Sequence, residues 1–341
     1  MHNQTNRLAL SITALILLIA FAGWFYAQNQ SRTLAQEQPV TTLELTGPIT
    51  DPNAELSGLG WYGDTLILLP QYPERFADGD GALFALPKAD ILAALDSSPQ
   101  TPLEPALVHL NAPGLTESIP NFQGFEAIGF SGDKVFLTIE AGEGTDMHGY
   151  LISGIMTPDL SEITLDVSNM VEIPLAFPSD NHSDEALIVT ADAVLTFFEI
   201  NGADLNPSPA AHVFDFDLNL QGTLSIPNLE YRLTDATLDG DTLWVINYFF
   251  PGDINLAPKS DPLADRYGEG KTHAEQDQVE RIVELNYSPD GITLADSAPI
   301  QLTLAGDTAR NLEGLVLLDE RGFLLVTDKF PSTLLMFVPR P

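Results

Sequence analysis

A short phrase rich in carboxylates recurs five times along the chain, and its residues are the best equipped for chemistry. Each copy joins acidic or amide residues to small and apolar neighbours, and a β-rich run ending in a carboxylate or amide follows it. The copies begin at Glu55, Gln123, Asp184, Thr234 and Glu313, and their following runs end at Gln71, Glu140, Glu199, Asn247 and Asp328. Such recurrence is typical of repeated supersecondary units that cannot bury their apolar faces alone.

Carboxylates that meet at a small opening must either hold protons at raised pKa values or bind a cation. Ligands that are all oxygen suit a hard ion such as Ca²⁺. We therefore expect Ca²⁺ or another ligand at a shared opening, with structural turn acids as the competing interpretation. The expected metal ligands are Glu55, Glu126, Asp184 and Asp235, and the expected catalytic residues are His182, Glu185 and Glu313.

Polar residues beside the phrase offer a base and contacts to a substrate. His182 lies in the polar cluster 181–185, and its titration near neutral pH suits a base or a ligand, although a lone loop histidine is commonly only solvated. Arg310 and Lys329 flank the acids of the fifth copy, where they either clamp a substrate oxygen or balance charge. The expected substrate contacts are Asn181, Asn247, Arg310 and Lys329.

The elements that must position these residues are β-strands. From Val40 onward, β-branched and aromatic runs alternate with clusters of Gly, Pro, Asn and Asp, the pattern of strands and turns. Only 88–95 resembles a helix. The second copy shows four such runs, at 125–130, 135–139, 149–155 and 163–173. Four antiparallel strands repeated radially make a blade, so we predict an all-β propeller of five four-stranded blades, or six if the long connections hide another.

The last repeat has only three strand-like runs, ending with 333–338, and 41–46 is a strand-like run without a partner. Pairing the two would close the ring and cover an open edge. In a propeller, the start of each blade's first strand and the end of its second strand open on the same face. The repeated phrase therefore maps one mouth of the ring.

One connection, 251–278, is long, polar and marked by Gly and Pro. A loop of that length inside a compact domain is usually either a functional lid or disordered. Its cationic residues, Arg266, Lys271 and His273, could fold over the opening or remain solvated.

Composition excludes several functions for the 341-residue chain. Asp and Glu number 48 against 14 Lys and Arg, which gives a formal charge of −34. Such a field repels nucleic acid and attracts cations, so we expect no nucleic-acid partner, although an acidic surface also serves solubility. The chain has no cysteine, and its 44% apolar content supplies a core without disulfides. We expect a monomer.

The N-terminal run 8–27 carries no charged residue and has Trp24 and Tyr26 at its outer end. It is long enough to cross a bilayer as a helix, so it is either an uncleaved transmembrane anchor or a signal sequence. Arg7 before the run favours a cytoplasmic N-terminus. We expect 28–40 to be a polar linker and 41–341 a propeller body outside the cytoplasm, periplasmic or extracellular, or secreted if the signal is cleaved.

Several segments together resemble a known family. They are Leu233-Thr-Asp-Ala-Thr-Leu-Asp-Gly-Asp-Thr-Leu243, Glu280-Arg-Ile-Val283, Asn311-Leu-Glu-Gly-Leu315 and Leu324-Leu-Val-Thr-Asp328. They look like the phytase-like family of secreted β-propellers with esterase-like activity, and 121–125 with 136–140 fits the same pattern. The similarity covers most of the body and lies in the blade repeat. A related propeller group regulated by quorum sensing shares the Ser-Gly-Leu and Glu-Gly-Leu phrases.

The resemblance implies an extracytoplasmic propeller that hydrolyses phosphate or carboxylate esters with the help of Ca²⁺. A polyanionic substrate such as phytate would require a basic cleft, and Lys and Arg are only scattered here. No G-x-S-x-G, H-E-x-x-H, P-loop or G-x-G-x-x-G motif follows a predicted strand. Two functions stay open: a Ca²⁺-dependent ester or phosphoester hydrolase acting on a small molecule, and a binding module for an envelope protein, peptide or glycan.

Overall fold

The structure, a computed structural model, describes residues 34–306 and 308–341. Ala35–Pro341 forms one compact unit, and this unit holds all the sheets of the described residues. The predicted anchor 8–27 and much of the predicted linker lie outside the described residues. Among the residues described, no helix is long and apolar enough to cross a membrane.

Within the described part of this unit, the strands form five four-stranded blades. The first contains β3 (Leu56–Tyr62), β4 (Thr65–Pro70), β5 (Ala82–Pro87) and β6 (Ala106–Asn111). The second contains β7 (Phe122–Ser131), β8 (Lys134–Glu143), β9 (Asp146–Met156) and β10 (Glu162–Leu165), with β11 (Val171–Ile173) paired to β9. The first two blades form one sheet because their outer strands β6 and β10 pair in parallel.

The other three blades are separate sheets. The third contains β12 (Asp184–Val189), β13 (Val194–Phe198), β14 (Ala210–Phe214) and β15 (Leu220–Ser225). The fourth contains β16 (Arg232–Asp239), β17 (Thr242–Phe249), β18 (Val279–Ser288) and β20 (Ile300–Leu302), with β19 (Gly291–Leu294) paired to β18. The fifth contains β21 (Leu312–Leu318), β22 (Gly322–Thr327), β23 (Leu335–Pro339) and β2 (Thr41–Leu43).

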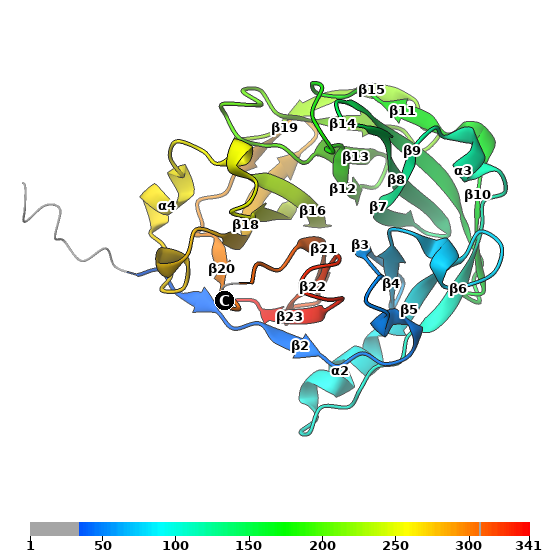
Figure 1. Ribbon diagram of the computed structural model, residues 1–341, viewed down its shortest axis with the longest axis horizontal. Helices are drawn as coiled ribbons and strands as arrows, with labels where there is room; N and C mark the ends of the chain where they lie inside the picture. The colour runs from blue at the N-terminus through cyan, green and yellow to red at the C-terminus, as the bar shows by residue number, and fades with distance from the viewer. Residues whose placement is uncertain (1–33, 307) are drawn as a thin grey trace, which may run out of the picture. The chain divides into compact units, whose positions relative to one another are not determined.

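The innermost strands of the blades form a closed ring. In Figure 1 they point toward a common centre, and each contacts the next in the order β3, β7, β12, β16, β21 and back to β3. Residues of all five strands line one axial cavity of about 160 Å³, which is walled by side chains such as Leu59, Ile128 and Leu187. The predicted all-β, propeller-like fold is therefore confirmed.

Small residues in the repeated phrase allow this close approach. A Cβ atom on Gly58 would lie 3.1 Å from the carbonyl oxygen of Glu126 on the neighbouring blade. A Cβ atom on Gly314 would lie 2.4 Å from a methyl group of Val326 and 3.0 Å from Leu59. The glycine or alanine that follows most of the acids is thus required by packing around the axis.

Each pair of neighbouring blades encloses its own buried apolar cluster, and the clusters continue around the ring. Between the fourth and fifth blades, the rings of Trp244 and Phe323 meet edge to face with centroids 5.5 Å apart. Because blades cover one another on both faces, second strands such as β4 and β22 are continuous apolar runs rather than alternating ones.

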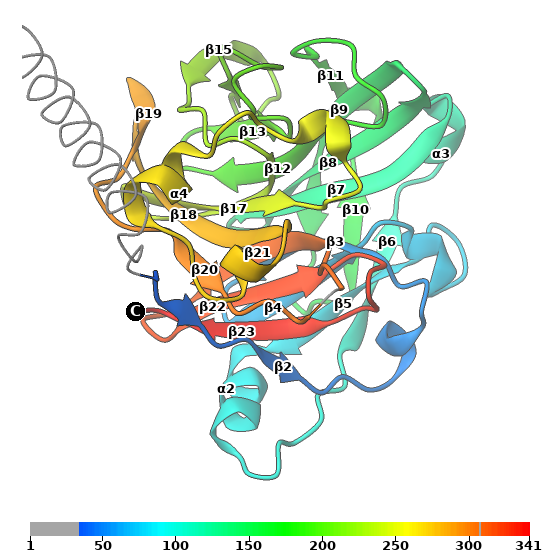
Figure 2. The ribbon, with the colours of Figure 1, turned by 60° about the vertical axis from the view of Figure 1, so that its left-hand side comes forward.

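The N-terminal segment closes the ring, as predicted. β2 pairs antiparallel with β23, placing Thr41 opposite Phe337 and Leu43 opposite Leu335, and Figure 2 shows the two strands side by side. Just before it, β1 (Glu37–Gln38) pairs in parallel with β20 of the fourth blade. These residues fall in the predicted linker, so the ordered segment begins earlier than 41.

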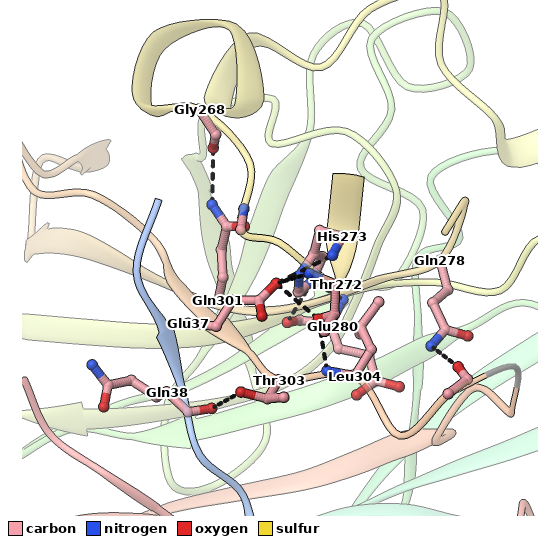
Figure 3. Close-up of polar contacts among 12 residues, drawn as sticks. Glu37, Gln38, Gly268, Thr272, His273, Gln278, Glu280, Gln301, Thr303 and Leu304 are labelled. Carbon is pink, nitrogen blue, oxygen red and sulfur yellow. Dashed lines mark hydrogen bonds and ion pairs between the residues drawn. The ribbon is translucent and has the colours of Figure 1, made fainter. Parts of the chain in front are cut away.

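A carboxylate anchors β1 to the long connection between β17 and β18. Oε1 of Glu37 accepts hydrogen bonds from the backbone N–H of Thr272 at 2.8 Å and of His273 at 3.1 Å. The Thr272 hydroxyl donates to the same oxygen at 2.8 Å, and Nδ1 of His273 lies 3.0 Å away. Figure 3 shows these groups converging on one side chain. These contacts tie the segment before β2 to the fourth blade.

The helical elements are short and lie in the connections. They are η1 (Pro48–Thr50), η2 (Pro73–Arg75), α2 (Lys88–Asp96), α3 (Leu115–Ser118), η3 (Val167–Asn169), η4 (Ile254–Leu256), α4 (Pro262–Tyr267) and η5 (His273–Glu275). The helix predicted at 88–95 is confirmed as α2. In the long connection, Asp261 caps α4 by accepting from the N–H groups of Leu263 and Ala264, so this segment is folded against the fourth blade.

Candidate functional site

A β-bulge interrupts the start of every innermost strand and explains how the acids converge. The register between the first and second strands shifts after Leu56, Phe125, Asp184, Leu233 and Leu312. A bulge inserts extra residues on one strand and re-aims their side chains. The inserted positions include Ser57, Glu126, Glu185, Asp235 and Glu313. Three of these, Glu126, Glu185 and Glu313, lie near enough for each to raise the pKa of another.

Arg232, at the start of β16, is the cation around which these carboxyl groups gather. Its Nε donates to Glu199, and its Nη2 lies 3.1 Å from both carboxyl oxygens of Glu185. The same Nη2 lies 3.6 Å from Oε1 of Glu313. The Arg232 side chain is 14% exposed, so the contacts are shielded from water. Glu126 and Glu140 complete the acidic wall, and Gln71 of the first blade donates to Glu126 at 3.1 Å.

Burial dominates the ionisation of this cluster. It raises the pKa values of Glu126, Glu185 and Glu313 well above the usual range. Burial also raises the pKa of Glu199 to about 7, against the opposing attraction of the Arg232 guanidinium. One guanidinium cannot compensate several buried carboxylates, so the cluster retains protons at neutral pH.

Glu185 and Glu199 form a pair that requires a shared proton. The two side chains are hydrogen-bonded to each other. Oε1 of the fully buried Glu199 has no N–H or hydroxyl donor among the described residues. Two carboxylates have only acceptor atoms, so the hydrogen bond between them exists only when one holds a proton. The pair therefore titrates as a unit and can act as a proton donor near neutral pH.

His182 lies beside the cluster as a neutral base. Its Nδ1 lies 2.9 Å from the hydroxyl of Ser179. Burial, assisted by the charge of Arg232, lowers the pKa of His182, while the Glu140 carboxyl opposes this shift. Its Nε2 makes no hydrogen bond to any residue in the described ranges. A neutral imidazole with a free nitrogen can accept a proton from water.

Glu55, expected as a metal ligand, is instead engaged in ion pairs at the edge of the mouth. Burial alone would raise its pKa, but hydrogen bonds from Lys329 and Arg75, each at 2.6 Å, lower the pKa below its usual value. The bulge of β3 falls at Ser57, so Glu55 lies two residues before the position that turns toward the axis. Lys329, expected to bind substrate, is held by this pair.

Asp184 and Asp235, also expected as metal ligands, make their hydrogen bonds outside the Arg232 cluster. Asp184 accepts from the Thr196 hydroxyl at 2.9 Å and lies 3.8 Å from Nδ1 of His212, within the third blade. Asp235 accepts from the N–H of Ala236 at 2.8 Å and of Leu315 at 2.6 Å. It therefore joins β16 to β21. Of the four expected ligands, only Glu126 belongs to the acidic wall.

The expected substrate contacts have mainly structural partners. Asn247 is fully buried, donates to the carbonyls of Glu230 and Arg232, and accepts from Arg281, so it fixes the backbone that presents Arg232. Arg310 is buried against Glu280, with Nε to Oε2 at 2.7 Å. Asn181 is exposed at a positive φ of 54° in the loop before β12.

The donor set does not fit the expected Ca²⁺ ion. Four carboxylates were expected to converge, yet three of them are used in ion pairs or backbone contacts elsewhere. In residues 34–306 and 308–341, no three His, Asp or Glu side chains are grouped so as to hold a metal ion. The positive charge that these carboxyl groups contact is the Arg232 guanidinium.

A pocket of about 420 Å³ opens beside Arg232. Its other lining residues are Tyr248, Phe250, Asp253, Thr308, Ala309, Asn311 and Phe330. None of these was predicted as a site residue, and neither was Arg232. The available signal was weak: Arg232 is a lone cation directly before the fourth copy of the phrase, and Tyr248 directly follows Asn247.

No protein-family model and no curated protein sequence matches this chain. The resemblance to the phytase-like family therefore rests on the blade repeat alone.

Three solved structures are similar to this chain. An exo-beta-1,3-galactanase from Phanerochaete chrysosporium aligns with a TM-score of 0.50 and 10% identity, over 89% of this chain and 64% of that one. A putative glycoside hydrolase from Parabacteroides distasonis aligns with a TM-score of 0.48 and 11% identity, over 91% of this chain and 95% of that one. An alpha-L-arabinofuranosidase from Clostridium thermocellum aligns with a TM-score of 0.45 and 11% identity, over 80% of this chain and 81% of that one. Likeness at such low identity concerns the fold alone.

Proposed function

We propose that this protein is a hydrolase whose active site is the acidic mouth, and that it cleaves carboxylic esters of small molecules. The observation that carries the proposal is the proton-sharing Glu185 and Glu199 pair, which is bound to Arg232, a residue that also lines a pocket. Nη1 of Arg232 makes no hydrogen bond to any described residue, so one donor is free for a substrate oxygen.

In the proposed reaction, the ester carbonyl oxygen accepts a hydrogen bond from Nη1 of Arg232, which stabilises the negative charge that develops there. Nε2 of His182 takes a proton from water as the water oxygen bonds to the carbonyl carbon. The carbon–oxygen bond to the alcohol then breaks, and the Glu185 and Glu199 pair gives its proton to the departing oxygen. The products are a carboxylic acid and an alcohol, and proton transfer from His182 restores the pair.

Electrostatics favour a carboxylic ester over a phosphate ester. A phosphate group near Arg232 would also meet Glu126, Glu185 and Glu313, and the guanidinium already binds carboxyl groups. A phosphate dianion would lose its hydration in this buried site, and the single guanidinium that could compensate it is already shared among carboxyl groups, so its binding is costly. A neutral ester avoids that cost. Among the activities that the phytase-like resemblance implies, carboxylic ester hydrolysis therefore suits this mouth better, without a calcium ion in the reaction.

Glycoside hydrolysis is the second candidate. A carboxyl group that stays protonated at neutral pH and a neighbouring carboxyl group are the two parts that such a reaction requires. The mouth offers Glu185 with Glu199 and, across the opening, Glu126. The structural neighbours named as glycoside hydrolases share only the fold with this chain.

We also propose that the body lies outside the cytoplasm on a membrane anchor formed by 8–27, or is secreted if that run is cleaved. The support is the uncharged apolar run after Arg7. Fractionation of cells, with protease treatment of the intact surface, checks this placement.

The decisive experiment is a turnover screen of the purified protein against p-nitrophenyl carboxylates, glycosides and phosphates, with and without Ca²⁺. We expect carboxylate turnover independent of Ca²⁺, lowered about 10²-fold or more in Glu185→Gln and Arg232→Gln. Lys259→Ala is the control, since Lys259 is exposed and, among the described residues, forms its ion pair with Asp204 alone. Turnover absent across the panel, with capture of an envelope component retained, would instead favour the binding module.

A further inference from the structure

We infer that the pocket beside Arg232 selects the acyl side of the substrate, and that it takes esters of apolar aliphatic or aromatic acids held between Phe250 and Phe330. The inference rests on the proposed function and names its substrate class. Phe250 and Phe330 line the same pocket as Arg232. An ester carbonyl on Nη1 of Arg232 therefore places its acyl group among these side chains.

The two aromatic side chains are unusually exposed. Phe250 is 47% exposed and Phe330 is 60% exposed. Single exposed apolar side chains are common on soluble proteins. Two rings that line the same pocket form a larger apolar surface, and burying that surface under a ligand is favourable. They come from neighbouring blades, Phe250 directly after β17 and Phe330 in the loop after β22. An apolar group between them would remove area from water on two sides.

Local hydrogen bonds fix the backbone from which both rings extend. The carbonyl of Phe250 accepts from the N–H of Asp253 at 2.9 Å in a tight turn. A Cβ atom on Gly252 would lie 2.2 Å from the Phe250 ring, so the ring lies directly over that glycine. The carbonyl of Phe330 accepts from the N–H of Asn311 at 3.0 Å. The pocket is thus shaped before any ligand arrives, which lowers the entropy cost of binding.

The polar groups of the pocket fit one neutral oxygen function rather than an anion. Arg232 offers a free donor, while Asp253 stands in the pocket wall and the acidic cluster lies behind. A free carboxylate would lose its hydration beside a guanidinium that already binds carboxyl groups, whereas an ester or amide carbonyl accepts the hydrogen bond without a net charge. At about 420 Å³ the pocket has the size of ordinary small-molecule sites.

The test compares p-nitrophenyl acetate with p-nitrophenyl hexanoate and measures the ratio of their kcat/KM values. We expect the wild type to prefer the hexanoate, and Phe250→Ala and Phe330→Ala each to lower the ratio about fivefold to tenfold through lost apolar contact. Gly252→Ala, which displaces the Phe250 ring without removing it, should lower the ratio in the same direction. Ile254→Ala is the matched control, because Ile254 lies in the same loop, is 76% exposed and does not line the pocket.

Direct binding separates the inference from the proposed reaction. Hexanamide carries the same acyl chain and a neutral carbonyl but is not readily hydrolysed, and its affinity is measured by calorimetry. Weaker hexanamide binding in both Phe→Ala variants but not in Ile254→Ala supports the acyl pocket, even if no ester is turned over and the hydrolase proposal fails. Equal hexanamide affinity in the wild type and all variants, or a wild-type ratio that favours acetate, overturns it.

Discussion

Replacing Glu199 by glutamine should flatten the dependence of stability on pH. Burial raises the pKa of Glu199 from the ordinary 4.5 to about 7. Between these values the folded protein holds a proton that the unfolded chain has released. Stability is therefore full below the ordinary pKa and falls as the pH rises through the folded pKa.

The size of the effect follows from that displacement. Each pKa unit corresponds to about 1.4 kcal/mol, so the free energy of unfolding lost between pH 4 and pH 8 through this group is about 3 kcal/mol. A glutamine can still accept from Nε of Arg232 and can donate its amide hydrogen to Glu185, so both contacts survive. We expect Glu199→Gln to be about as stable as the wild type at pH 4 and more stable at pH 8.

Urea unfolding of both proteins at intervals from pH 4 to pH 8 measures the difference. Because Glu199 and Glu185 titrate as a unit, the difference between the two curves reports the pair. Glu320→Gln is the matched control, since Glu320 is an exposed glutamate in the turn between β21 and β22. Parallel curves for the wild type and Glu199→Gln would show that this carboxyl group is not buried as the structure places it.

Three further perturbations have expected outcomes. Arg232→Leu leaves buried glutamates without their cation. It should lower the free energy of unfolding by about 3–5 kcal/mol at pH 8 and by less at pH 5, where the glutamates are protonated. An equal loss at the two pH values in urea unfolding would contradict this. Asp235→Ala leaves two buried N–H groups without an acceptor and should lower the free energy of unfolding by about 2–4 kcal/mol. A thermal unfolding temperature close to that of the wild type would refute the link between β16 and β21. Glu37→Ala removes the acceptor shown in Figure 3 and should speed hydrogen exchange at Thr272 and His273, whereas exposed Glu44→Ala should not.

Much of the architecture could be predicted because it depends on patterns that are visible in the local sequence. The repeat with one strand missing and the unpaired run at 41–46 together indicated the closure that β2 and β23 make. The apolar runs that became β4 and β22 marked strands covered on both faces. These features depend on local composition and on the need to cover an edge.

The site was only partly predictable, because its geometry depends on bulges that no local pattern marks. Aligning the repeats on their acids selected Glu55, whereas the bulge of β3 falls at Ser57. The same alignment selected Asp184, one residue before the bulge that presents Glu185. Arg232 was missed because a single arginine before a strand has no distinguishing neighbours in the sequence, and only the ring brings Glu199 and Glu185 to it. The catalytic roles of His182, Glu185 and Glu313 remain predictions.

The most direct measurement is the pH dependence of kcat/KM for the best carboxylic ester, in the wild type and in Glu199→Gln. We expect the wild-type rate to fall as the pH rises past about 7, because the Glu185 and Glu199 pair then loses the proton that it gives to the leaving alcohol. In Glu199→Gln this limb should move or disappear. A falling limb at the same pH in both proteins, or a rate that stays constant from pH 5 to pH 9, would contradict the role of the Arg232 cluster.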